Sequence, residues 1–141
     1  GPVRAARYWG LTQQDHYSKS DVWPLDPDGE ILVVIQIEDT AGISNLPEML
    51  ENVPGIGAVL IGEGDLGQEL GYPRQYDHPA LLEAIAEIVA VSREHGVIVG
   101  HPHANAGNMQ RLLDEGFRFL MTATARSDTD LEKGLELTGR P

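Results

Sequence analysis

The sequence has no cysteine, few basic residues and no long apolar run. Without cysteine, disulfide bonds, zinc–thiolate centres and cysteine nucleophiles are excluded. Ten Lys and Arg stand against 22 Asp and Glu, and the formal net charge of -12 argues against a nucleic-acid-binding surface, which needs clustered basic side chains. No apolar stretch approaches the ~20 residues that span a bilayer. No apolar segment follows Arg4 and Arg7 as it would in a signal peptide, so we expect a cytoplasmic protein.

What the sequence does contain is enough apolar material for one domain with a real core, because 41% of its 141 residues are hydrophobic. Residues 1–29 mix polar, aromatic and turn-forming residues without a helical or strand period. We predict an irregular segment there, with one short helix near residues 13–20. From residue 30 to residue 141 the pattern becomes regular, and we predict a portion built of repeated βα units.

Four short apolar runs alternate with amphipathic runs in this second part. Strands are predicted at 31–37, 58–61, 97–99 and 117–121. Helices are predicted at 44–52, 67–70, from 79 to just before Gly96, at 106–115, and after Ser127 or Asp128. Strands this short and apolar are typical of a parallel sheet that is buried on both faces.

Two architectures fit this α/β order: four consecutive units of a (β/α)8 barrel, or a small open sheet. Half of a barrel would leave two bare sheet edges, which natural proteins avoid. If the chain is half of a barrel, we expect it to be the C-terminal part of a longer protein or to be completed by another chain.

Two carboxylates that end neighbouring strands carry the main functional hypothesis. Strand alternation places Gln36 and Glu38 on one face, and Asp65 follows the next strand through the glycine-rich stretch Gly62–Asp65. Carboxyl ends of parallel strands meet at one edge of a sheet, where barrel enzymes place their sites. Oxygen ligands of this kind suit Mg²⁺ or Mn²⁺. The structural alternatives are that Glu38 caps a loop or forms a salt bridge, and that residues 62–65 form a tight turn.

Two further stretches contain polar side chains near the end of a predicted strand. His101 and His103 invite a zinc interpretation, but Pro102 extends the chain, and we expect the two rings to point to opposite sides. One of them, His101 as the first choice, could act as a base or hydrogen-bond donor at the pocket mouth. The small and hydroxyl residues at 122–127 suit a pocket floor or an anion site, or simply a turn into the last helix.

These motifs together resemble the metal-dependent, class II pyruvate aldolases, the 4-hydroxy-2-oxoheptanedioate aldolase and citrate lyase β-subunit group of the phosphoenolpyruvate–pyruvate superfamily. The resemblance rests on Gln36–Glu38, Leu60–Leu66, Leu70–Pro73 and His78–Pro79. It implies the C-terminal half, about four βα units, of a TIM (β/α)8 barrel.

The same resemblance implies a divalent metal ion (Mg²⁺, Mn²⁺ or Co²⁺) held by Glu38 and Asp65. It places Gln36 near the substrate oxygens and uses the backbone N–H groups of Gly64 and Asp65 to bind the carboxylate of a pyruvate-like 2-oxo acid. The implied reaction is retro-aldol cleavage of a 4-hydroxy-2-oxo acid to pyruvate and an aldehyde, without a Schiff-base lysine. A homo-oligomer, or completion by an N-terminal half barrel, is implied as well.

The sequence departs from the family in two respects. The family usually reads Gly-Pro-Ala-Asp where this chain has Gly62-Glu63-Gly64-Asp65. The catalytic His base and the substrate-binding Arg of the family belong to the first half of the barrel, and no residue here matches them. Two other hypotheses therefore stay open: a catalytically inactive metal-binding or oligomerising half barrel, and a relative that cleaves citryl or malyl thioesters of CoA, for which a basic patch is missing.

Overall fold

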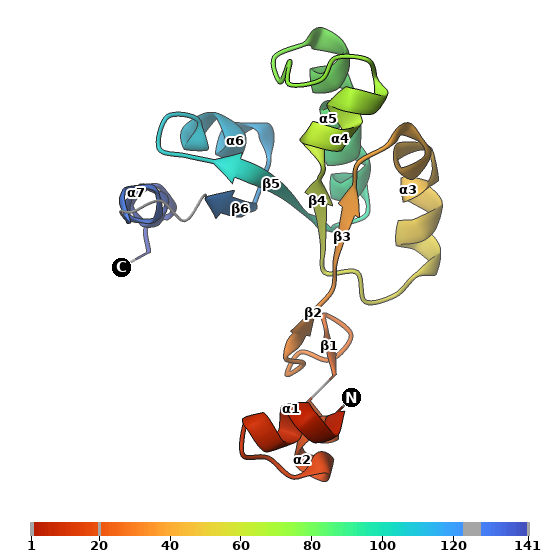
Figure 1. The fold of residues 1–141 in the computed structure, drawn as a ribbon, viewed down its shortest axis with the longest axis vertical. Helices are drawn as coiled ribbons and strands as arrows, with labels where there is room; N and C mark the ends of the chain where they lie inside the picture. Colours follow the sequence, from red (N-terminus) through yellow and green to blue (C-terminus); the bar gives the residue numbers. More distant parts are fainter. Residues whose placement is uncertain (1, 20, 123–127, 141) are drawn as a thin grey trace.

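The structure is a computed structural model that describes residues 2–19, 21–122 and 128–140. From residue 34 onward, each strand is followed by one or two helices, as the sequence predicts (Figure 1). In chain order the elements are α1 (Pro2–Tyr8), α2 (Gln13–Lys19), β1 (Val22–Trp23), β2 (Ile31–Leu32), β3 (Val34–Ile37), α3 (Thr40–Asn52), β4 (Ala58–Ile61), α4 (Glu63–Glu69), α5 (Pro79–Glu94), β5 (Ile98–Ala104), α6 (Met109–Glu115), β6 (Phe119–Thr122) and α7 (Thr129–Thr138).

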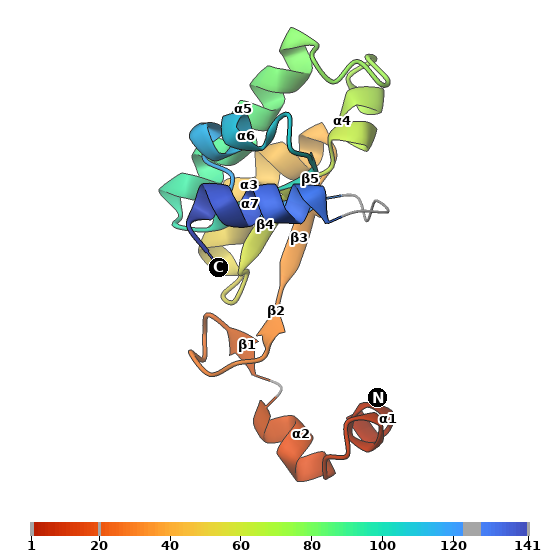
Figure 2. The same ribbon diagram turned by 90° about the vertical axis from the view of Figure 1, so that its left-hand side faces the viewer.

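A four-stranded parallel sheet forms the centre of the molecule, in the order β3-β4-β5-β6. Each strand pairs with the next one along the chain, which is the arrangement of consecutive βα units. The carboxyl ends of β3 and β4 point toward α4 (Figure 1). At the other end of the molecule, α1 and α2 pack against each other beyond the separate parallel pair β1-β2 (Figures 1 and 2).

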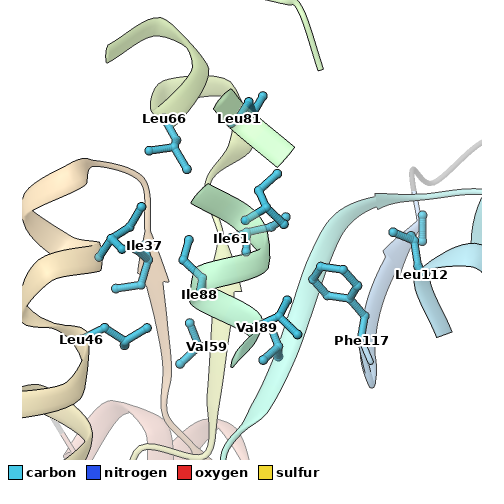
Figure 3. Packing of buried hydrophobic residues seen from close by; sticks show 14 of the residues in the cluster. Ile37, Leu46, Val59, Ile61, Leu66, Leu81, Ile88, Val89, Leu112 and Phe117 are labelled. Atoms are coloured by element: carbon cyan, nitrogen blue, oxygen red, sulfur yellow. The ribbon is translucent and has the colours of Figure 1, made fainter. Parts of the chain in front are cut away.

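The hydrophobic core lies between one face of this sheet and the helices that cover it (Figure 3). Alternate strand residues such as Ile37, Val59 and Ile61 meet Leu46 of α3 and Ile88 of α5, and none of these five is more than 3% exposed. Burying one such side chain stabilises the fold by about 1.5–3 kcal/mol. The core therefore fixes where β3 and β4 end, and with them the residues that follow.

The opposite face of the sheet is exposed at residues of β3, β5 and β6, whereas Ala58 and Leu60 of β4 are buried, at 2% and 9% exposed. Val34, Ile98 and Met121 occupy it, and they are 38%, 38% and 43% exposed. In a closed barrel, side chains on this face would fill the interior. The chain therefore has the sheet of a barrel wall, and the part of the chain that the structure describes does not close it.

The structure corrects the predicted start of two helices. Helix α3 begins at Thr40 rather than residue 44, because the side chain of Asp39 caps it by accepting a hydrogen bond from the N–H of Gly42 at 2.5 Å. Pro47 therefore lies inside the helix and not in its first turn. Helix α4 begins at Glu63, directly after β4, where a loop was expected.

The other predicted elements are present with shifted ends. The first strand is divided into β2 and β3 at Val33, and β5 runs on to Ala104. Helix α5 starts at Pro79 with His78 as its cap, and Gly116 closes α6 in the left-handed conformation, with φ 106°. A second helix, α1, precedes the predicted one at residues 13–20. Among the helices of the described ranges, none has the length and apolar character that a bilayer crossing requires.

Candidate metal-binding and substrate site

Glu38 directly follows β3 at the carboxyl edge of the sheet. Its neighbour Ile37 is buried at 3%, whereas Gln36 and Glu38 are both exposed on the other face. The amide of Gln36 donates a hydrogen bond to Glu38 Oε2 at 2.7 Å. The prediction that these two polar side chains share one face is therefore confirmed. The amide holds one carboxylate oxygen and leaves the other open to a ligand.

Gly62 brings the end of β4 against Glu38. A Cβ at this position would lie 2.4 Å from Glu38 Cβ and 3.0 Å from Gln36 Nε2, so a larger residue does not fit without displacement. The N–H of Gly62 also donates to the carbonyl oxygen of Ile37 at 2.7 Å. The backbone of the 62–65 stretch thus lies directly beside the Glu38 side chain.

Asp65 extends from the first turn of α4 and is exposed. The intrahelical hydrogen bonds of α4 begin with the N–H of Leu66, which donates to the Gly62 carbonyl at 3.0 Å. The N–H groups of Gly64 and Asp65 precede that bond, so the helix does not use them. The turn therefore presents two backbone donors and one carboxylate at its start.

The structure brings Glu38 and Asp65 to one open hollow. The hollow has a volume of about 540 Å³, and Asp39, Ala41, Gln68 and Glu69 complete its lining. Asp39 caps α3, and Glu69 accepts two hydrogen bonds from Thr40, so these two acids already have structural partners. Within the described residues, neither Glu38 nor Asp65 pairs with a basic side chain.

The donor set fits a hard divalent cation. Two exposed carboxylates and no opposing basic group suit Mg²⁺ or Mn²⁺, which keep several waters and substrate oxygens as ligands. Across the described residues, no group of three or more His, Cys, Asp or Glu could hold a metal ion. A cation here would therefore have two protein carboxylates at most, with open positions for substrate.

His101 lies elsewhere, in a second cavity of about 460 Å³ that shares no lining residue with the hollow. Both His101 and His103 face the buried carboxylate of Glu63: His103 Nδ1 is hydrogen-bonded to Oε1, and His101 Nε2 lies 3.5 Å from Oε2. The expectation that the two rings point to opposite sides is wrong. Residues two apart in a strand share a face, and both histidines lie within β5.

Burial lowers the pKa of His101 from its ordinary value of 6.5. Glu63 opposes this shift, whereas His103 and Arg111 add to it. Because its pKa lies below 6.5, the His101 ring is mainly neutral at pH 7. The suggested contact of His101 with substrate stays a prediction, and residues 123–127 lie outside the described part of the chain.

Two features of this region were not predicted from the sequence. The first is the pairing of Glu63, for which the signal is that an acid in an apolar βα turn costs free energy unless it is paired, and that two histidines lie in the next strand. The second is that Asp39 and Glu69 line the hollow. Asp39 immediately precedes the helix and has the side chain of a typical N-cap, which is a signal that the sequence contains.

Comparison with known proteins identifies the family of this chain. The sequence profile of the HpcH/HpaI aldolase/citrate lyase family matches residues 11–126. The 4-hydroxy-2-oxo-heptane-1,7-dioate aldolase of Escherichia coli is 34% identical over 127 residues, which are 84% of this chain and 48% of that protein. The hydroxypyruvate/pyruvate aldolase of Roseobacter denitrificans is 28% identical over 130 residues, covering 86% and 50%.

A solved structure shows the same fold. The HpcH/HpaI aldolase from Desulfitobacterium hafniense aligns with a TM-score of 0.62 at 22% identity, over 92% of this chain and 60% of that one. The prediction of a portion of a TIM barrel is confirmed. The chain spans about half the length of the curated relatives it matches. On the family profile and these relatives, the chain belongs to the HpcH/HpaI aldolase/citrate lyase family.

Proposed function

We propose that this chain carries the metal-binding half of an aldolase that cleaves 4-hydroxy-2-oxo acids to pyruvate and an aldehyde. The observation that carries the proposal is that Glu38, after β3, and Asp65, in the helical turn after β4, line one open hollow, and that neither has a basic partner among the described residues. In this proposal residues 30–141 are the barrel portion, and residues 1–29 are a separate N-terminal segment.

Each residue of the hollow has a defined task in the proposal. Glu38 and Asp65 hold the divalent cation, and the Gln36 amide keeps one Glu38 oxygen oriented through its 2.7 Å hydrogen bond. The N–H groups of Gly64 and Asp65 bind the substrate carboxylate at the start of α4. When bound, the cation would act as a Lewis acid that draws electron density from the 2-oxo group while the carbon–carbon bond breaks.

The two lysines fit a reaction without a Schiff base. Lys19 ends α2, and Lys133 lies on α7, where it pairs with Glu136 at 2.8 Å. A base and a substrate-binding Arg would come from the first half of the barrel, which would also cover the exposed sheet face. A homo-oligomer in which a second copy covers that face is the competing arrangement.

Calorimetric titration of Mn²⁺ into the chain tests the proposal, with and without oxalate as an analogue of the pyruvate enolate. We expect one site whose affinity rises with oxalate and which Glu38→Ala and Asp65→Ala each abolish. Glu83→Ala, which removes an exposed acid of α5, is the matched control and should bind normally. Equal binding by all three variants would contradict the proposed site.

Product formation separates an enzyme from an inactive half barrel. Pyruvate release from a 4-hydroxy-2-oxo acid, measured with lactate dehydrogenase, should appear when the preceding half of the barrel is supplied. Metal binding without pyruvate release under those conditions would instead support a metal-binding or oligomerising role. Cleavage of a CoA thioester alone would favour the citryl or malyl lyase alternative.

A further inference from the structure

Glu63 is a buried acid whose role the proposed reaction does not explain. It is the first residue of α4, two positions before Asp65, and only 6% of it is exposed. Its side chain lines the same cavity as His101 and His103, whereas Asp65 lines the hollow beside Glu38. The two carboxylates of one helical turn therefore lie in different environments.

Both oxygens of the Glu63 carboxylate have histidine partners on β5. Oε1 is hydrogen-bonded to His103 Nδ1, and Oε2 lies 3.5 Å from His101 Nε2. A buried carboxylate without partners is costly, so these contacts determine where the first turn of α4 can lie. They join the start of α4 to the neighbouring strand.

His101 is itself held in one orientation. Its Nδ1 accepts a hydrogen bond from the backbone N–H of His103 at 3.2 Å, which leaves the proton of the neutral ring on Nε2, facing Glu63. Phe117 packs against the ring edge-to-face, with centroids 5.1 Å apart and planes at 87°. The ring is only 9% exposed, so the partner of Glu63 is fixed by packing as well as by hydrogen bonding.

The other side of the same turn rests against Glu38. The close approach of Gly62 to Glu38 Cβ fixes the backbone where α4 begins. The turn that carries Asp65 is therefore held on one side by Glu38 and on the other by the Glu63–histidine contacts. Loss of the second contact would leave the turn held by Glu38 and by the core packing of Leu66 and Gly67, and the Glu63 side of Asp65 would be free to move.

We propose that Glu63, paired with His101 and His103, is a positioning residue that sets Asp65 relative to Glu38 for cation binding. The proposal rests on the function proposed above. Glu63 stands where the family usually has the proline of Gly-Pro-Ala-Asp. In this proposal the contacts of the Glu63 side chain give the turn the rigidity that a proline ring would otherwise give it.

The test compares Mn²⁺ affinity in the intact chain and in three variants. Glu63→Ala removes both contacts and should weaken binding by about tenfold, at the lower end of the effect of outer-shell partners on metal sites. Glu63→Gln should keep most of the affinity, because its amide oxygen accepts from His101 and its NH₂ group donates to His103 Nδ1. His103→Ala, at an exposed ring, should give an intermediate loss without unfolding the chain.

Relaxation of water protons by bound Mn²⁺ gives a second readout. If Asp65 no longer reaches the ion in Glu63→Ala, an extra water takes its place and the relaxation enhancement rises. Glu83→Ala again serves as the control for loss of one negative charge. Unchanged affinity and relaxation in Glu63→Ala and His103→Ala would overturn the positioning role.

The two proposals fail in distinguishable ways. If the unmodified chain does not bind Mn²⁺ through Glu38 and Asp65, the proposed function itself fails. If binding depends on those two residues but is equally strong in Glu63→Ala, only the positioning role fails. If Glu63→Gln is as weak as Glu63→Ala, hydrogen bonding to the histidines is not what positions the turn, and the proposal is also overturned.

Discussion

Gly62 is the residue that lets the ends of β3 and β4 come close enough to share a site. A methyl group there would overlap Glu38 Cβ at 2.4 Å, so Gly62→Ala should lower the free energy of unfolding by about 1–3 kcal/mol, the usual cost of overpacking. Gly64→Ala is the matched control, since its Cβ meets no atom within 4 Å and alanine favours a helix. Urea unfolding measures both. Equal stability of the two variants would contradict the close approach.

His101 makes the stability of the chain depend on pH. Its pKa is lowered below 6.5 in the folded state, chiefly by burial, while the unfolded chain titrates at the ordinary value. The unfolded state therefore binds more protons in the window just below pH 6.5, and stability is fully present above 6.5 and decreases as the pH falls through that window. Denaturant midpoints at several pH values measure the slope.

A His101→Gln variant separates this contribution from that of the carboxylates. The glutamine does not titrate, so the variant should show a smaller loss of stability between neutral and mildly acidic pH than the unmodified chain. His95→Gln provides the comparison at a second, half-buried histidine. An identical pH slope in the unmodified chain and in His101→Gln would show that His101 is not held neutral by burial.

Helix α3 depends on Asp39 for its start. The carboxylate accepts a hydrogen bond from the Gly42 N–H, so Asp39→Ala should cost about 0.5–2 kcal/mol of stability, whereas Asp39→Asn should be nearly neutral because asparagine also caps helices. Thermal or urea unfolding compares the two. A loss of equal size in both would show that the charge, and not the cap, matters at this position.

Helices and strands whose apolar residues repeat at a regular spacing were predictable from the sequence. A helix that begins directly at the end of a strand was not. The strands Val34–Ile37 and Ala58–Ile61 and the apolar stripe of α5 are recognisable from the sequence pattern alone. Helix α4 has glycine at two of its first five positions, which disfavours helix by propensity. It forms because Leu66 and Gly67 pack into the core, a tertiary contact that local sequence does not reveal.

The candidate site, like the fold, was predictable from the sequence in part. Parallel strands that run side by side place Glu38 and Asp65 at one edge, and the structure brings them to one hollow. The contacts of Glu63 with the two histidines were not predicted, because an extended chain at Pro102 was expected to point the two rings to opposite sides. The partner of a buried acid depends on which strand lies beside it, and that is a property of the assembled sheet.

The exposed sheet face makes a prediction for the complete molecule. Ile98→Lys should change the stability of this chain by no more than about 0.5 kcal/mol, because the side chain is already 38% exposed. It should prevent assembly with the preceding half of the barrel, since the lysine charge would be buried. Leu82→Lys, at a residue of α5 that is 42% exposed, should assemble normally. Size-exclusion chromatography of the co-expressed halves compares them, and equal assembly by both would contradict a covered face.

The central claim concerns one cation held between two strand ends, and diffraction from crystals grown with Mn²⁺ tests it most directly. Anomalous scattering locates the ion without reference to activity. We predict one strong peak within coordination distance of carboxylate oxygens of both Glu38 and Asp65. A peak on Glu63 and the histidines instead, or side chains of Glu38 and Asp65 that contact no common ion, would contradict the account.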